Sequence, residues 1–187
     1  MTDHIVGTNL QDTISAGAGD DYVAAGAGND VIMGGSGNNT IYGGSGNDQI
    51  YSDGGDDAIF GGTGNDTITS GDGADVIFGG ADNDRIRSSS GNDIVNGDSG
   101  DDYLEGGSGD DSVHGGTGND YVVAGAGNDF DAGGGGFDTI DFSGASTAML
   151  IDLAMNTATG MGTDTIQGFE GVIGSALGDV IRGSSAT

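Results

Sequence analysis

Aspartate recurs at every ninth residue over most of this chain, and oxygen ligands at so regular a spacing suit a row of hard cations. From Gly7 to Asp141 the sequence divides, without insertion, into fifteen units of the form G-G-x-G-x-D-x-U-x, where U is aliphatic. The sixth place is Asp in fourteen units, and Asn39 is the exception. The carboxylates that we predict to bind metal are those of Asp12, Asp21, Asp30, Asp48, Asp57, Asp66, Asp75, Asp84, Asp93, Asp102, Asp111, Asp120, Asp129 and Asp138.

The other residue types narrow the choice of metal. Cys is absent and His occurs only twice, which disfavours zinc and copper sites. Glycine permits positive φ and brings consecutive carbonyl groups close together with no side chain between them. Carboxylate and carbonyl oxygens in such a loop suit Ca²⁺ better than Mg²⁺. The sequence therefore predicts calcium sites.

Each unit contains the elements needed to position these ligands. The residues G-G-x-G-x-D predict a loop, and x-U-x predicts a strand of three residues in which we expect only U to face inward. Two units with opposed strands make one turn of 18 residues, so each Asp lies beside the Asp 18 residues later. Such neighbours repel one another unless a cation lies between them. Eleven neighbouring pairs have two carboxylates, which predicts about eleven Ca²⁺.

The unit resembles the RTX, or hemolysin-type, calcium-binding nonapeptide repeat. This resemblance implies an all-β fold, a parallel β-roll solenoid with Ca²⁺ held in two rows along its edges by loop carbonyls and the sixth-place Asp. We expect a lead-in over 1–6, fifteen repeats over 7–141, and a C-terminal β cap with degenerate repeats over 142–187. Within the cap, Asp164 and Asp179 stand in repeat-like stretches and are weaker ligand candidates.

Some units depart from the pattern. Ser88–Ser90 replace the glycines of one loop, and Asp53, Asp82 and Asp98 replace single loop glycines. Asp131 interrupts the aliphatic column. Altered cation sites and changes without functional consequence are both compatible with these replacements.

The composition excludes several classes of function. A net charge of −27 argues against nucleic acid and anionic membranes as partners. The N-terminus lacks a basic region followed by an apolar run, and no apolar stretch approaches the length of a membrane span, so we expect neither a Sec signal nor a transmembrane segment. The motifs H-E-x-x-H and G-x-S-x-G are absent, and we predict no enzyme activity. With few large apolar residues, the ion-free chain is expected to be disordered.

Two functional hypotheses remain. The first is a secreted structural protein, extracellular or at the cell surface, that folds on binding Ca²⁺ and assembles with itself end to end or laterally into a fibre, matrix or surface layer. Tyr42, Phe60 and Phe78 support it, because they should stack on an exposed face that either stabilises the sheet or contacts another chain. The second is a folding and secretion module of a larger exoenzyme, toxin or adhesin, which the family resemblance links to type I secretion. A glycan-binding or ice-binding face is less well supported, because the outward Thr column is interrupted.

Overall fold

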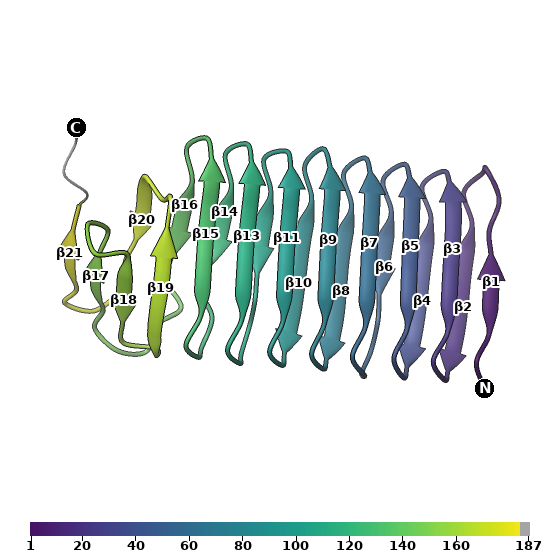
Figure 1. The fold of residues 1–187 in the computed structure, drawn as a ribbon, viewed down its shortest axis with the longest axis horizontal. Coiled ribbons are helices and arrows are strands. Elements are labelled where there is room, and N and C mark those ends of the chain that lie inside the picture. The colour runs from purple at the N-terminus through teal and green to yellow at the C-terminus, as the bar shows by residue number, and fades with distance from the viewer. Residues whose placement is uncertain (184–187) are drawn as a thin grey trace.

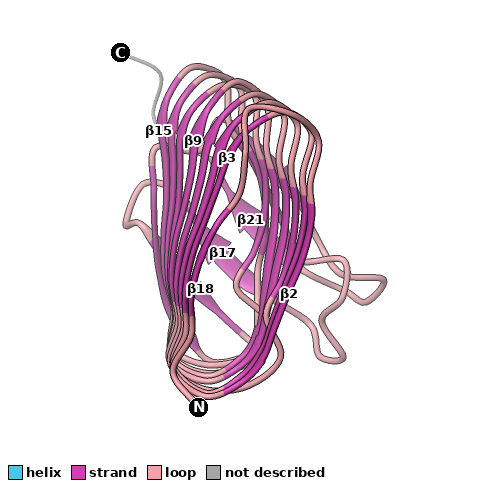
Figure 2. Ribbon diagram, turned by 90° about the vertical axis from the view of Figure 1, so that its right-hand side faces the viewer, coloured by secondary structure: helices cyan, strands magenta, loops and turns pink. Residues whose placement is uncertain are grey.

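The computed structural model describes residues 1–183, which form two facing sheets joined at both edges by short loops (Figure 1). Strands that follow one another along the repeats alternate between the sheets, and the two sheets run in opposite directions. Viewed along the long axis, the turns superpose as a flattened coil (Figure 2). None of these residues belongs to a helix that could cross a membrane.

The larger sheet contains twelve strands within residues 1–183. In order across the sheet they are β1 (His4–Val6), β3 (Tyr22–Ala27), β5 (Thr40–Ser45), β7 (Ala58–Thr63), β9 (Val76–Ala81), β11 (Ile94–Ser99), β13 (Ser112–Thr117), β15 (Phe130–Gly135), β19 (Thr163–Gln167), β18 (Thr157–Thr159), β17 (Leu150–Asp152) and β21 (Val180–Arg182).

The facing sheet contains nine strands of the described chain, all parallel. They are β2 (Thr13–Ala18), β4 (Val31–Ser36), β6 (Gln49–Tyr51), β8 (Thr67–Asp72), β10 (Arg85–Ser90), β12 (Tyr103–Glu105), β14 (Tyr121–Val123), β16 (Thr139–Asp141) and β20 (Gly171–Ile173).

The register between turns is the 18-residue spacing that the sequence predicts. Ile41 pairs with Ile59, and Ile59 pairs with Ile77 on the next strand. These side chains are fully buried, as are Ile68 and Ile86 of the facing sheet. The core is therefore narrow, with aliphatic side chains of the two sheets packed between them.

Many strands are longer than the predicted three residues. β7, for example, includes the first three residues of the following unit. Side chains alternate between the two faces of a strand, so the first place of a unit faces the core, as U does. Ser70 and Ser88 hold this place and are fully buried. The expectation that only U faces inward was wrong.

Both ends of the repeat region carry additional strands. β1 pairs in parallel with β3, and the Asp3 backbone N–H donates to Asp21 Oδ1 at 2.6 Å, so residues 3–6 have the conformation of the end of a repeat. At the other end, β17, β18 and β19 are antiparallel neighbours. Phe142 and Ile151 are buried beside the last turns. Residues 184–187 of the predicted cap lie outside the described residues.

Candidate metal sites along the two edges

The predicted ligands lie in two rows, one along each edge of the β-roll. The row that follows the strands of the twelve-stranded sheet, here called the upper edge from its place in Figure 1, contains Asp12, Asp30, Asp48, Asp66, Asp84, Asp102, Asp120 and Asp138. The lower edge contains Asp21, Asn39, Asp57, Asp75, Asp93, Asp111 and Asp129. Apart from Asp12, all are buried, with at most 5% of the residue exposed. Ionisable side chains are rarely buried to this extent without a partner.

One oxygen of each buried carboxylate has a partner. The backbone N–H of Asp48 donates to Asp66 Oδ1, and that of Asp66 donates to Asp84 Oδ1, both at 2.8 Å. The same bond recurs between turns along both edges. Oδ1 therefore links neighbouring turns and fixes the orientation of the carboxylate.

The second oxygen is different. In the part of the chain that the structure describes, Oδ2 is buried without a hydrogen-bond partner in Asp21, Asp30, Asp48, Asp66, Asp75, Asp84, Asp93, Asp102, Asp111, Asp120, Asp129 and Asp138. Buried polar atoms normally have a hydrogen-bond partner, because a buried polar atom without one has lost its hydration and gained nothing in return. A repeated exception along both edges therefore points to a ligand.

Backbone oxygens line the space that Oδ2 faces. A Cβ placed on Gly43 would lie 2.6 Å from Asp48 Oδ2 and 2.6 Å from the carbonyl oxygen of Gly61. The first-place glycine thus leaves a small space that is lined by the carboxylate of its own unit and by a carbonyl group of the next turn.

Asn39 reveals two more oxygens of this space. Its Nδ2 donates to the carbonyl oxygens of Gly35 at 3.2 Å and Gly37 at 3.0 Å, in the second and fourth places of its unit. We use the term cradle for this set of groups. It comprises the sixth-place Oδ2, the second- and fourth-place carbonyls of the same unit, and the first-place carbonyl 18 residues later. In the Asp units all of these groups are hydrogen-bond acceptors.

Left-handed backbone conformations direct these carbonyls. Gly62 and Gly64, in the second and fourth places, have φ of 119° and 106°. L side chains strongly disfavour this region. Asp82, Ser89 and Asp98 nevertheless adopt it, with φ of 77°, 84° and 72°. These three replacements therefore preserve the course of the loop at the cost of backbone strain.

The electrostatics of the cradles favour a cation. Burial, and with it the like charge of neighbouring carboxylates, raises the pKa of Asp48 to about 6, of Asp66 to about 7 and of Asp84 to about 8. The cause is loss of hydration, which penalises the charged form. A Ca²⁺ ion in a cradle would supply positive charge to a carboxylate and to carbonyl oxygens, which are its preferred ligands. The residues present fit this ion.

Both rows continue into the cap. The Asp129 N–H donates to Asp164 Oδ1 at 3.2 Å, and Asp164 Oδ2 is buried without a partner, as in the repeats. On the upper edge the Asp138 N–H donates to Glu170 Oε2 at 3.0 Å. The sequence pattern does not indicate Glu170, because this residue follows Asp138 across an irregular segment and not by 18 residues.

Two further Asp residues differ from the rows. Asp179, a weaker candidate from its sequence, accepts hydrogen bonds from the Met149 N–H at 2.8 Å and the Ser175 hydroxyl at 2.6 Å, neither of which belongs to a row residue. Asp131 faces the core in place of an aliphatic residue. Burial and the nearby Asp129 and Asp164 carboxylates raise its pKa to about 8.

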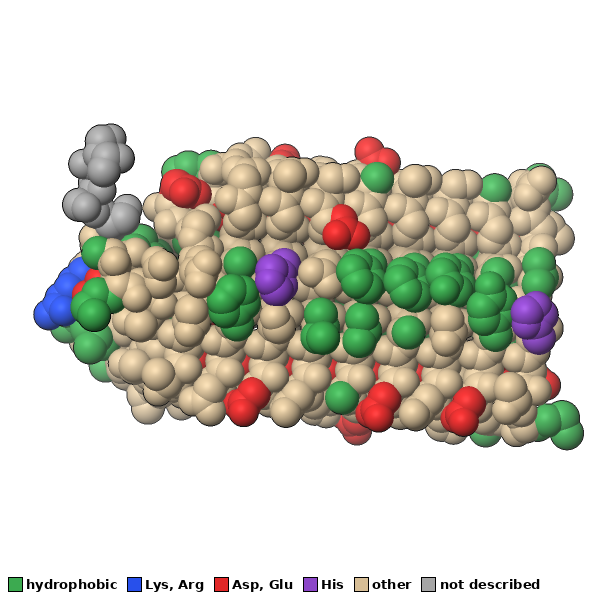
Figure 3. Space-filling view, viewed as in Figure 1, with side chains coloured by type: hydrophobic (Ala, Val, Ile, Leu, Met, Phe, Trp, Pro, Cys, Tyr) green, Lys and Arg blue, Asp and Glu red, His purple; other side chains and the backbone are tan. Residues whose placement is uncertain are grey.

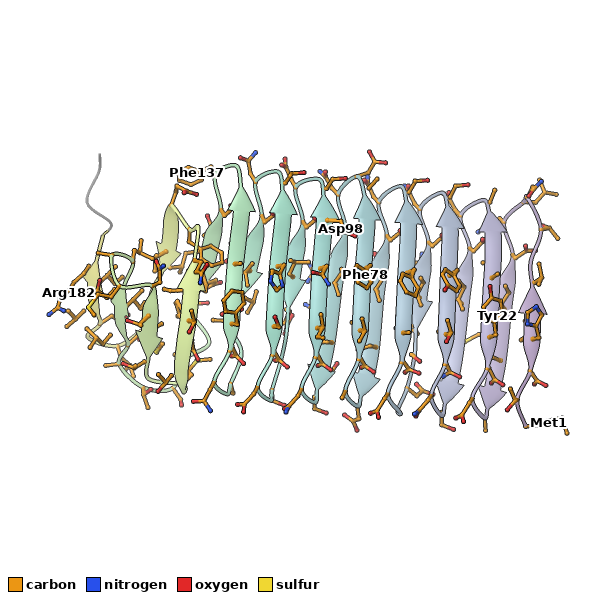
Figure 4. The ribbon with its side chains drawn as sticks, viewed as in Figure 1. Met1, Tyr22, Phe78, Asp98, Phe137 and Arg182 are labelled. Atoms are coloured by element: carbon orange, nitrogen blue, oxygen red, sulfur yellow. The ribbon has the colours of Figure 1, made fainter. Side chains whose placement is uncertain are left out.

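The exposed face of the twelve-stranded sheet carries the predicted aromatic ladder (Figures 3 and 4). Tyr42 stacks on Phe60 with ring centroids 4.7 Å apart, and Phe60 stacks on Phe78 at 5.4 Å. His4 and Tyr22 also stack, at 4.6 Å, beside Tyr42. The sequence predicted Tyr42, Phe60 and Phe78 and missed His4 and Tyr22.

A parallel β-roll with 18-residue turns and oxygen-lined cradles at both edges defines a class of calcium-binding repeat protein. The family model of the RTX calcium-binding nonapeptide repeat matches this chain in overlapping segments, at residues 2–32, 25–59, 33–68, 60–95, 69–104, 96–131 and 105–140. The chain belongs to this family, whose repeats bind Ca²⁺ and are typically non-catalytic. A comparison with curated proteins finds no match.

Proposed function

We propose that this protein is a calcium-folded β-roll that has a structural role outside the cell or at its surface. The observation that carries the proposal is the row of buried Asp Oδ2 atoms that face carbonyl oxygens without a hydrogen-bond donor. When an ion-free chain folds, it must bury these oxygen atoms without a hydrogen-bond donor or a cation, and the cost of doing so opposes folding. Calcium removes that penalty.

The stabilisation that Ca²⁺ binding would provide is large enough for the chain to be unfolded inside the cell and folded outside it. Extracellular calcium modules bind with Kd of about 10⁻⁴ to 10⁻³ M, and an ion present at ten times Kd stabilises the fold by about 1.4 kcal/mol per site. Eleven such sites would contribute about 15 kcal/mol, comparable to the stability of a whole domain. At cytosolic Ca²⁺ this contribution vanishes, which would leave an unfolded chain suited to type I secretion.

Self-association would give the folded protein its structural role. β1 and β2 lie at the margins of the two sheets, and unpaired strand margins are sites for pairing with another chain. The aromatic ladder offers a second, lateral surface, on which Tyr42 is 38% exposed.

The alternative is a folding and secretion module of a larger exoprotein. It is favoured by the cap, because the antiparallel strands β17 and β18 interrupt the parallel stacking at one end. A capped end disfavours end-to-end addition of turns. Ordered polymers in Ca²⁺ would support the structural protein, and a stable monomer would support the module.

The test is a Ca²⁺ titration of the chelated protein, followed by circular dichroism and light scattering, with Mg²⁺ as the control ion. We expect a cooperative transition from coil to β structure with Ca²⁺ only, and growth in particle size once the β signal appears. A chain that folds equally well in chelator, or with Mg²⁺, would contradict the calcium-driven fold.

Paired variants locate the effect at the cradles. Asp48→Ala with Asp66→Ala removes two cradle carboxylates and should raise the Ca²⁺ concentration at the folding midpoint. Asp101→Asn with Asp110→Asn removes the same charge from exposed fifth-place residues, keeps the Oδ1 atoms that accept the backbone N–H of Asn119 and Asn128, and should leave the midpoint nearly unchanged. Equal shifts would mean that net charge, and not the cradle, controls folding.

A further inference from the structure

The two edges of the β-roll differ in the first-place residue of each unit. On the upper edge this place is occupied only by glycine or alanine: Gly7, Ala25, Gly43, Gly61, Gly79, Gly97, Gly115 and Gly133. On the lower edge, three successive units have serine, namely Ser52, Ser70 and Ser88, and they directly follow the unit that holds Asn39. Four neighbouring cradles of the lower edge therefore contain a side-chain donor in the first or sixth place, and the upper edge has none at these two places.

Asn39 supplies its own donor to the first of these cradles. Its Nδ2 donates to the carbonyls of Gly35 and Gly37 at 3.2 and 3.0 Å and lies 3.4 Å from Ser52 Oγ. The residue is 2% exposed. An amide group thus occupies the position from which a cation would contact these carbonyls, and it has no charge to attract one.

Ser52 supplies a donor to the second. Its hydroxyl donates to Asp57 Oδ2 at 2.6 Å. Asp57 is the one sixth-place Asp of the lower edge, within the described chain, whose Oδ2 has a hydrogen-bond partner. The oxygen that elsewhere faces the cradle without a donor is here satisfied by the chain itself.

Ser70 and Ser88 act on a different oxygen of the third and fourth cradles. The Ser70 hydroxyl donates to the Ser88 carbonyl at 2.9 Å, and the Ser88 hydroxyl donates to the Gly106 carbonyl. Each acceptor is the first-place carbonyl 18 residues later, which belongs to the cradle. Both serines are fully buried, so their side chains also fill space that a first-place glycine leaves open.

We propose that these four successive cradles of the lower edge, from Asn39 to Asp93, are closed by the chain's own amide and hydroxyl groups and do not take up Ca²⁺. Calcium then binds along the upper edge and at the two ends of the lower edge, and the chain takes up about four ions fewer than it would with every cradle open. The inference rests on the proposed calcium-dependent fold and adds to it which sites the ion uses.

The test compares the number of Ca²⁺ ions bound per chain by the wild type and by a variant with Asn39→Asp, Ser52→Gly, Ser70→Gly and Ser88→Gly, using isothermal titration calorimetry. We expect the variant to bind about four more ions, one for each opened cradle. The fraction of folded protein should also rise more steeply with Ca²⁺ concentration for this variant than for the wild type. Circular dichroism in saturating Ca²⁺ verifies that both proteins are folded.

Two further variants serve as matched controls. Ser36→Gly, Ser45→Gly and Ser108→Gly remove exposed third-place hydroxyls and add the same number of glycines, and should leave the ion number unchanged. A reciprocal variant with Gly61→Ser and Gly79→Ser on the upper edge should bind about two ions fewer than the wild type.

The outcomes separate this inference from the function on which it rests. Equal, non-zero ion numbers in the wild type and the four-residue variant would overturn the inference alone. Fewer ions in that variant would show that the hydroxyls act as calcium ligands, and would also overturn it. Absence of calcium binding in both proteins would overturn the proposed function as well.

Discussion

Asn39 shows how an amide fits the sixth place, and Asp66→Asn would transfer that arrangement to the upper edge. The new Nδ2 would face the carbonyls of Gly62 and Gly64, as Asn39 Nδ2 faces those of Gly35 and Gly37. Each neutral hydrogen bond contributes about 0.5 to 1.5 kcal/mol, so two of them should stabilise the ion-free fold by about 2 kcal/mol. The substitution also removes a buried carboxylate oxygen that has no donor.

Calcium should reverse this advantage. The wild type gains one ion that the variant lacks, which contributes about 1.4 kcal/mol at ten times Kd and about 2.7 kcal/mol at one hundred times Kd. At the lower Ca²⁺ concentration, the free energy of unfolding of the Asp66→Asn variant should therefore exceed that of the wild type by only about 0.6 kcal/mol. At the higher concentration, the wild type should be the more stable protein by about 0.7 kcal/mol.

The assay is urea unfolding followed by circular dichroism at several fixed Ca²⁺ concentrations. For the chelated proteins, a stabilising osmolyte such as trimethylamine N-oxide shifts the equilibrium toward the folded state. Asp101→Asn is the matched control, because it removes the same charge at an exposed fifth place where Asn65 and Asn119 stand in other units. We expect its stability to change by no more than about 0.5 kcal/mol in any condition.

The assignment of an ion to this cradle would be refuted if the difference in free energy of unfolding between the Asp66→Asn variant and the wild type did not vary with Ca²⁺ concentration. A variant that is less stable than the wild type in chelator would refute the other half of the reasoning, since Oδ2 would then already be satisfied in the ion-free fold.

Three further predictions follow from the core, the loops and the buried carboxylates. Ile68→Ala should cost about 2 to 5 kcal/mol in urea unfolding with Ca²⁺, because the side chain is fully buried; a cost under about 1 kcal/mol would mean that the core rearranges. Asp98→Gly should stabilise the protein by about 1 kcal/mol through relief of positive φ, whereas Asp98→Ala, which removes the charge and keeps the strain, should not. Burial raises the pKa of Asp66 to about 7 and of Asp84 to about 8, so the folded chain binds protons that the unfolded chain releases, and ion-free stability should increase as pH falls from about 8 toward 4. Loss of β signal in chelator between pH 8 and pH 5 would contradict the last prediction.

The regular part of this fold could be predicted from the sequence because its spacing never changes. An uninterrupted nine-residue period places every residue beside the one 18 positions later, as the pairing of Ile59 with Ile77 shows. The same spacing predicted the stack of Phe60 on Phe78, and it also brings Arg87 beside Glu105, where the ion pair measures 2.9 Å.

Within one unit, the sequence did not indicate the direction of each side chain. Ser88 and Ser89 look alike as replacements of loop glycines, yet Ser88 is buried against the cradle and Ser89 adopts a φ of 84° in the turn. The difference arises from the alternation of side chains along a strand that is longer than the pattern predicted.

The sequence alone determined the period, the parallel register, the two Asp rows and the choice of calcium, because each depends on local spacing repeated by simple translation. The tertiary structure decided which carboxylate oxygen remains unpaired, which cradles contain a donor, and that Glu170 and Asp164 continue the rows. These features depend on contacts between successive turns and on the packing of a non-periodic cap, and packing of that kind has no counterpart in the spacing of residues along the chain.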